Sequence, residues 1–179
     1  MRLVSYIFLA YFALALQIGL APYIAYHGAA PNLVLLAVVF IAVHAPRDAA
    51  LLGCFALGFL QDLVTLQQPG LFALSYGLVA MFVVSTQQVV YKEHPLTHFS
   101  LALAAGLIAA AVLLAHGWVR PPAPRTVAAG TVLPAVRIST TRELYRVLYT
   151  ALLAPVLLGL LQRARGAFGF QGRRRVRAW

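Results

Sequence analysis

Five apolar segments of bilayer-spanning length and a sixth, shorter one constrain the fold of this 179-residue chain more than any other feature. A helix needs about 20 residues to cross a hydrocarbon core roughly 30 Å thick. The shortest segment, 32–44, must tilt, cross a thinned region or dip without spanning. The sequence therefore predicts an all-α, polytopic integral membrane helical bundle of about six transmembrane helices, the second one short, with spans at about 3–24, 32–44, 48–66, 70–91, 97–118 and 143–162.

The composition agrees with a bilayer location. Hydrophobic residues make up 62% of the chain, charged residues 10%, and the mean hydropathy is +0.85, whereas soluble domains carry about 25% charged residues. The net charge of +10 raises the question of nucleic acid, but the cations lie between and beyond the apolar segments and form no stripe with interleaved aromatic residues. We therefore expect residues 1–162 to form a transmembrane helical domain and residues 163–179 a basic cytoplasmic tail, with no nucleic-acid partner.

The distribution of cations predicts the orientation. If all six segments cross and the N-terminus is cytoplasmic, loop 119–142 lies outside with four arginines. Because cytoplasmic loops carry an excess of Lys and Arg, we expect both termini in the cytoplasm. Nine of the fourteen cations then lie inside: Arg2, Arg47, Lys92, Arg163, Arg165, Arg173, Arg174, Arg175 and Arg177.

One carboxylate, Asp62, lies within apolar segment 48–66, above a stripe of small residues at Ala50, Cys54 and Gly58. A charge at membrane depth costs roughly 3 kcal/mol on insertion scales, so it persists mainly where protein covers it. Small residues let a second helix approach closely. The stripe either holds this chain's own helices together or forms a groove for a partner helix, and Asp62 is interpreted as a structural or partner-binding group, not a transport residue.

Patterns typical of enzymes are weak. Ser75 lies in Ala73-Leu74-Ser75-Tyr76-Gly77, which approximates a nucleophile elbow, but that motif needs a strand-turn-helix context and this serine lies in a helical run. His94 and His98 have metal-ligand spacing, yet Pro95 between them indicates a helix start. Cys54 is the only cysteine, so there is no thiolate cluster. We expect no enzyme activity, cofactor, metal or small-molecule substrate.

The segment from Gly53 to Leu63, GCFALGFLQDL, followed by PGLFAL from Pro69, resembles the signature of the rod-shape-determining protein MreD family. In that signature a glycine-bearing helix ends in an aspartate, and a short turn leads into the next helix. Pro31-Asn32-Leu33 similarly resembles the start of the family's short second helix. Carried onto this chain, the family positions are Gly58, Asp62 and Gly70, with Pro31 and Asn32 at the second helix.

The resemblance implies a non-enzymatic scaffold subunit of the bacterial elongation machinery in the inner membrane. Such a subunit binds an MreC-like protein and helps direct lateral peptidoglycan synthesis together with MreB, RodA and penicillin-binding protein 2. It also implies a fold similar to that of vitamin-transporter substrate-binding subunits. The alternative function is therefore a small-solute carrier subunit, although the expected small-residue face of the first helix is interrupted, because Ala10 is followed by Leu14 and Ala13 by Gln17.

Overall fold

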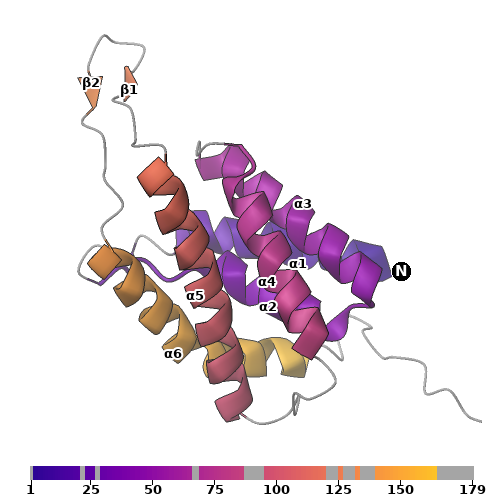
Figure 1. The fold of residues 1–179 in the computed structure, drawn as a ribbon. Helices are drawn as coiled ribbons and strands as arrows, with labels where there is room; N and C mark the ends of the chain where they lie inside the picture. Colours follow the sequence, from indigo (N-terminus) through magenta and orange to yellow (C-terminus); the bar gives the residue numbers. More distant parts are fainter. Residues whose placement is uncertain are drawn as a thin grey trace, which may run out of the picture.

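The computed structural model describes residues 2–20, 23–26, 29–65, 69–86, 95–119, 125–126, 132–133 and 140–164. Within these residues the chain forms a bundle of six helices (Figure 1). A two-residue antiparallel pair, β1 (Arg125–Thr126) with β2 (Val132–Leu133), lies in the segment between the last two helices. The helices are α1 (Arg2–Gly19), α2 (Leu33–His44), α3 (Arg47–Thr65), α4 (Leu71–Thr86), α5 (Pro95–Val119) and α6 (Thr140–Ala164).

Helices α2, α3, α5 and α6 begin and end close to the predicted segments, but α1 ends at Gly19, earlier than the expected boundary at residue 24. The sequence has a proline at position 22, which cannot donate a bond to the carbonyl four residues earlier and disfavours helical conformation in the residue before it. The expected end of the fourth segment, loop residues such as His94, and the basic tail from residue 165 lie outside the described residues.

Three helices, α3, α5 and α6, are long and apolar enough to cross a membrane. The other described apolar helices are shorter: Ile7–Gly19 within α1, Leu33–His44 and Leu71–Thr86. Together with the helical content, these lengths confirm the predicted fold class, an all-helical membrane bundle.

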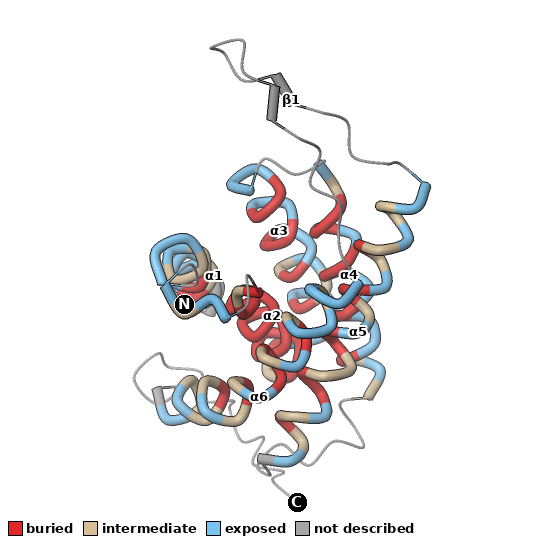
Figure 2. The backbone as a smooth tube through the Cα atoms, turned by 90° about the vertical axis from the view of Figure 1, so that its left-hand side faces the viewer, coloured by how far each residue is buried: buried red, intermediate tan, exposed pale blue. Residues whose placement is uncertain are grey.

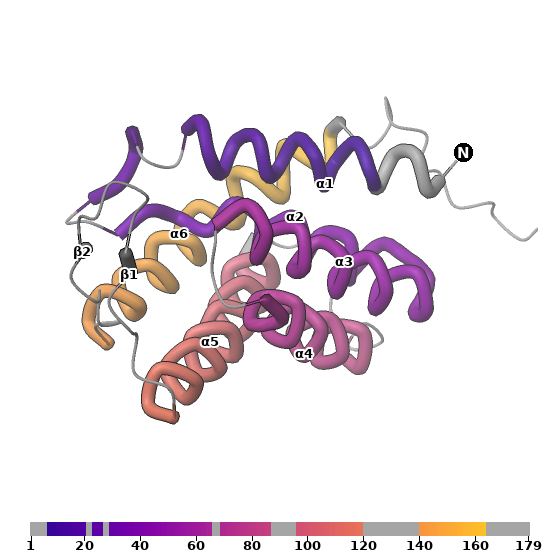
Figure 3. The backbone as a smooth tube through the Cα atoms, turned by 90° about the horizontal axis from the view of Figure 1, so that it is seen from above, coloured from indigo at the N-terminus to yellow at the C-terminus, as the bar shows by residue number. Residues whose placement is uncertain are grey.

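Helix α2 forms the centre of the bundle. Every residue from Leu33 to Val43 is buried, and Figure 2 shows α2 as the most continuously buried segment, with other helices around it. The other five helices all pack against it, and Figure 3 shows α1 lying along one outer side. A helix that is apolar on all sides is stable only when surrounded, which explains why the shortest predicted segment is the core.

Helix α6 bends along its length, as Figures 1 and 3 show. It contains Pro155, which has no amide hydrogen to donate and whose ring clashes with the carbonyl one turn earlier. A proline at this position of a helix is a usual cause of such a bend. Helix α6 packs against α5 and, through Thr150, also contacts the N-terminal end of α2.

Candidate functional site

The first turn of α4 is capped by a side chain from α3. Gly70 precedes the helix with a positive φ of 97°, and its carbonyl accepts the first helical bond, from Leu74. Glycine has no side chain with which to cap a helix. The Asp62 carboxylate supplies the missing acceptor, because it receives hydrogen bonds from the backbone amides of Gly70 (2.9 Å), Phe72 (2.9 Å) and Ala73 (3.2 Å).

This arrangement accounts for a buried acid that has no basic partner among the described residues. Asp62 is 1% exposed, yet it faces the positive end of the α4 dipole and amides that have no intrahelical acceptor. A carboxylate at a helix N-terminus is favourable for both reasons. In the described contacts, the Asp62 carboxylate holds the end of α3 against the start of α4, and we refer to this junction as the α3–α4 corner.

Gly58 makes that corner possible. A Cβ atom at this position would lie 2.5 Å from the carbonyl oxygen of Phe72 and 2.6 Å from the Cα atom of Ala73. Both are backbone atoms of α4, which a side-chain rotation cannot move. Only glycine allows α3 to approach α4 closely enough for Asp62, one turn later, to reach the amides.

The rest of the small-residue stripe also faces the interior of the chain. Ala50 and Cys54 are both 0% exposed, and the Cys54 thiol lies 3.5 Å from the carbonyl oxygen of Val38 in α2. Of the two interpretations of the stripe, packing within the chain is therefore the one that the described contacts show. A partner helix has no access to these residues while α2 and α4 are in place.

A second cluster of polar side chains surrounds the start of α2. The Asn32 side chain caps α2 by accepting a bond from the Leu35 amide (3.0 Å). Gln17 of α1 accepts a bond from the Leu33 amide (2.7 Å) and donates one to the Pro31 carbonyl (3.2 Å). The non-helical turn at Pro31 thus has its backbone groups satisfied by protein, as membrane depth would require.

Three further helices join this cluster. The Tyr76 hydroxyl of α4 donates to Gln61 Oε1 of α3 (2.7 Å) and accepts from Asn32 Nδ2 (3.0 Å). Thr150 of α6 accepts a bond from the Asn32 amide (2.9 Å) and donates to the Arg146 carbonyl (2.7 Å). We refer to Gln17, Asn32, Gln61, Tyr76 and Thr150 as the polar cluster.

The polar cluster and the Asp62 cap are fully hydrogen-bonded. Among the described residues, no buried side-chain nitrogen or oxygen lacks a partner. Unpaired polar groups are costly in an apolar interior, so such networks fix one arrangement of the helices. The described hydrogen-bond partners of the polar cluster and of Asp62 all belong to this chain.

The serine and the histidine that were considered as chemical groups both contact other groups of this chain. Ser75 is buried, and its hydroxyl donates to the Leu71 carbonyl of its own helix (2.8 Å). His98 of α5 contacts Gln162 of α6, with 3.1 Å between the two nitrogens. The described part of the chain contains no group of three His, Cys, Asp or Glu side chains that could hold a metal.

Most of the polar cluster was not predicted from the sequence. Asn32 was singled out by its motif, whereas the contacts of Gln17, Gln61, Tyr76 and Thr150 were not predicted. The available signal was the presence of neutral polar side chains inside apolar segments, where each needs a partner.

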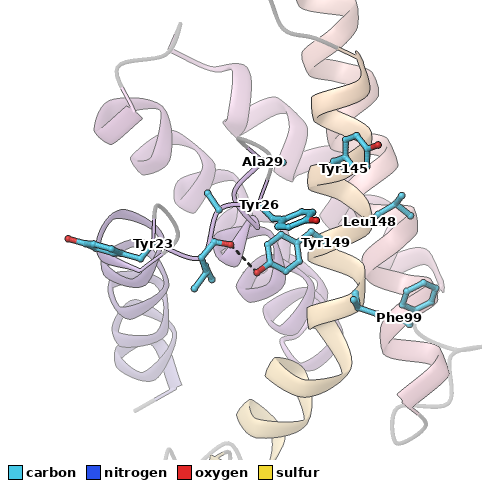
Figure 4. Close-up of a pocket in the computed structure, with 10 residues that line it drawn as sticks. Tyr23, Tyr26, Ala29, Phe99, Tyr145, Leu148 and Tyr149 are labelled. Atoms are coloured by element: carbon cyan, nitrogen blue, oxygen red, sulfur yellow. Dashed lines mark hydrogen bonds between the residues drawn. The ribbon is translucent and has the colours of Figure 1, made fainter.

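A pocket of about 620 Å³ lies at the outer side of α6. One wall is the connection between α1 and α2, and the other is α6, with Phe99 of α5 at one end. Figure 4 shows the two walls and the hydrogen bond between them, which the Tyr149 hydroxyl donates to the Ile24 carbonyl (3.0 Å). The lining includes Tyr26, Ala29, Phe99, Tyr145, Tyr149 and Leu152.

A scan against protein families finds that the model for the rod shape-determining protein MreD matches residues 1–122. Neither the curated proteins nor the solved structures gave a match. The matched region covers more than two thirds of the 179 residues and contains the Asp62 cap and every member of the polar cluster except Thr150. The chain therefore belongs to the rod shape-determining protein MreD family.

Proposed function

We propose that this protein is a non-enzymatic scaffold subunit of the bacterial cell-elongation machinery. Membership of the MreD family supports a role in rod-shape determination. In this proposal it binds an MreC-like membrane protein and, with MreB, RodA and penicillin-binding protein 2, helps direct lateral peptidoglycan synthesis. The family match over residues 1–122 is the observation that carries the proposal.

The contacts of the buried polar groups support a structural role. Asp62, the acid within an apolar segment, bonds to backbone amides of α4, and Ser75 bonds within its own helix. A proton relay or an ion pathway needs acidic groups that face a cavity or one another. The described bonds of these side chains instead join helices or close a helical turn.

We further propose that the protein lies in the inner membrane with residues 1–162 as its transmembrane domain, residues 163–179 as its tail, and both termini in the cytoplasm. The excess of cations assigned to the cytoplasmic side supports this orientation. Reporter fusions at the C-terminus and within loop 119–142 test it. A cytoplasmic signal from the C-terminal fusion and a periplasmic signal from the loop are expected, and the reverse pattern contradicts the orientation.

The experiment that tests the function is deletion in the native bacterium, scored for loss of rod shape and followed by complementation with an affinity-tagged copy. Restored rods and co-purification of an MreC-like protein are expected. A tagged, unrelated multi-pass protein of similar abundance is the control. Normal rods after deletion, or no enrichment of an MreC-like protein over the control, would contradict the proposal.

Because the stripe at Gly58 is filled by α4, a partner helix must meet another surface. Tryptophan substitutions at exposed positions of α3 and α6 locate that surface through loss of co-purification at unchanged abundance. Suitable positions, all at least 44% exposed, are Leu52, Phe59, Leu63, Leu148, Val156 and Leu160.

The pocket beside α6 is the observation that favours the alternative, a vitamin-type carrier subunit. Its lining is almost entirely apolar, whereas small-molecule sites usually add a few convergent polar groups that orient the ligand. A carrier should gain thermal stability with a vitamin-like solute, whereas the scaffold should not.

A further inference from the structure

We propose that the pocket between the α1–α2 connection and α6 binds an acyl chain of an anionic phospholipid, whose headgroup lies beside Arg142. This proposal is independent of the scaffold function. We refer to the site as the tyrosine pocket, because Tyr23, Tyr26, Tyr145 and Tyr149 are among its lining residues.

The size and lining of the tyrosine pocket suit a hydrocarbon chain. Its volume of about 620 Å³ lies within the range of roughly 300–1,000 Å³ typical of ligand sites. The Tyr149 hydroxyl donates a hydrogen bond to the Ile24 carbonyl. The apolar ring of Tyr149 is therefore the part of this side chain that a ligand would contact. An apolar lining of this kind favours an apolar occupant over water.

The pocket also has concave walls, unlike the rest of the exposed side of α6. Val156 and Leu160 are 67% and 61% exposed and line no part of it. Nearer the start of the helix, Tyr149 faces the α1–α2 connection, which forms a second wall (Figure 4). A chain lying between two walls contacts more protein than one lying on a convex helix, and dispersion contacts add up.

Tyrosine is enriched where membranes meet water, because its ring is apolar and its hydroxyl is polar. Four of the eight tyrosines of the chain line this one pocket. This clustering indicates that the pocket lies at the membrane interface, with an end near the level of lipid headgroups.

Positive charge near the start of α6 determines which lipid headgroup is favoured. Arg142 is exposed and lies three residues before Tyr145 and seven before Tyr149, a spacing that places all three on one side of α6. The nearby N-terminus of α6 adds positive potential. An anionic headgroup is therefore favoured over a zwitterionic one.

Native mass spectrometry of the full-length protein tests the proposal. The protein is exchanged into detergent containing phosphatidylglycerol and phosphatidylcholine with identical acyl chains, and the fraction that retains one lipid is measured. We expect preferential retention of phosphatidylglycerol.

A variant that blocks the pocket tests where the lipid binds. Leu152→Trp should fill the pocket and reduce lipid retention by about tenfold, which corresponds to a tenfold weaker affinity. Leu160→Trp, at a similarly exposed position outside the pocket, is the matched control and should retain lipid normally.

A second pair of variants separates the headgroup from the chain. Arg142→Gln should reduce the preference for phosphatidylglycerol by about fivefold, as expected for one cation, and leave retention of phosphatidylcholine unchanged. Arg163→Gln, an exposed cation near the other end of α6, should have no effect. Equal retention by Leu152→Trp and Leu160→Trp, absence of any preference between the two lipids, or displacement by a vitamin-like solute would overturn the proposal.

Discussion

The Asp62 carboxylate of α3 accepts a hydrogen bond of 2.9 Å from the backbone amide of Phe72, in the first turn of α4. It accepts two more, from Gly70 and Ala73. One side chain thus caps a helix whose own preceding residue, Gly70, has no side chain to do so. The acid is stabilised by unpaired amides and the helix dipole, which makes a basic partner unnecessary.

Replacing Asp62 with alanine should destabilise the bundle by roughly 2–3 kcal/mol or more. The substitution removes a cap and leaves buried amides without acceptors. Asp62→Asn keeps one oxygen acceptor and should cost less. The measurement is the temperature at which Cys54, the only cysteine and fully buried, becomes reactive toward a maleimide dye in detergent.

Asp48→Asn is the control for that experiment. Asp48 is exposed in the first turn of α3, so its removal should change stability only through a weak dipole effect, below about 1 kcal/mol. If Asp62→Ala and Asp48→Asn labelled at the same temperature, the capping role of Asp62 would be wrong.

Gly58→Ala should lower stability by about 1–3 kcal/mol, the usual range for overpacking, or prevent folding. The added methyl group would meet backbone atoms of α4 at 2.5–2.6 Å, so α3 and α4 must separate. Gly77→Ala is the matched control, because its methyl group would lie 3.6 Å from a Phe55 ring carbon, an ordinary contact. Cys54 labelling should distinguish the two variants, and similar labelling temperatures would contradict the close α3–α4 approach.

Asn32 and Tyr76 should be energetically coupled. Tyr76→Phe leaves Gln61 Oε1 and Asn32 Nδ2 without their common partner, at a cost of about 1–3 kcal/mol. In a double-mutant cycle with Asn32→Ala, the combined loss should differ from the sum of the single losses by roughly 0.5–3 kcal/mol. Thermal unfolding of the four proteins measures this difference. Strict additivity would show that the two side chains act independently.

Ser75→Ala should leave cell shape and protein abundance unchanged in a complemented deletion strain, and so should His116→Ala, which replaces a histidine in the last turn of α5. The Ser75 hydroxyl bonds within its own helix, so its loss removes only a local contact. Cell width and membrane abundance are the measurements. Rounded cells with a normal amount of folded Ser75→Ala or His116→Ala protein would indicate a chemical role.

The fold class could be predicted because the length and apolarity of a segment are properties of the sequence alone. The central position of α2 was less accessible. Its shortness was visible, but its burial on all sides depends on the five other helices that surround it. The early end of α1 was missed because hydropathy continues past Gly19, whereas the backbone effect of the proline at position 22 does not appear in a hydropathy count.

The candidate site could be predicted only in part. The cost of a buried charge indicated that protein covers Asp62, but its partners are backbone amides, and an amide carries no sequence signature. Gly58 was identified as a contact position, although the identity of the opposing helix depends on the turn at Gly70. The polar cluster joins residues as far apart as Gln17 and Thr150, and only packing brings such positions together.

Complementation with Asp62→Asn tests the central claim most directly. Asparagine is nearly the same size as aspartate and can accept a hydrogen bond, but it can neither carry a charge nor relay a proton. Cell width should be compared between wild-type and Asp62→Asn strains whose expression is adjusted to equal amounts of folded membrane protein. The structural role predicts rods of equal width at equal amounts, and rounded cells at a wild-type amount of folded Asp62→Asn protein would contradict it.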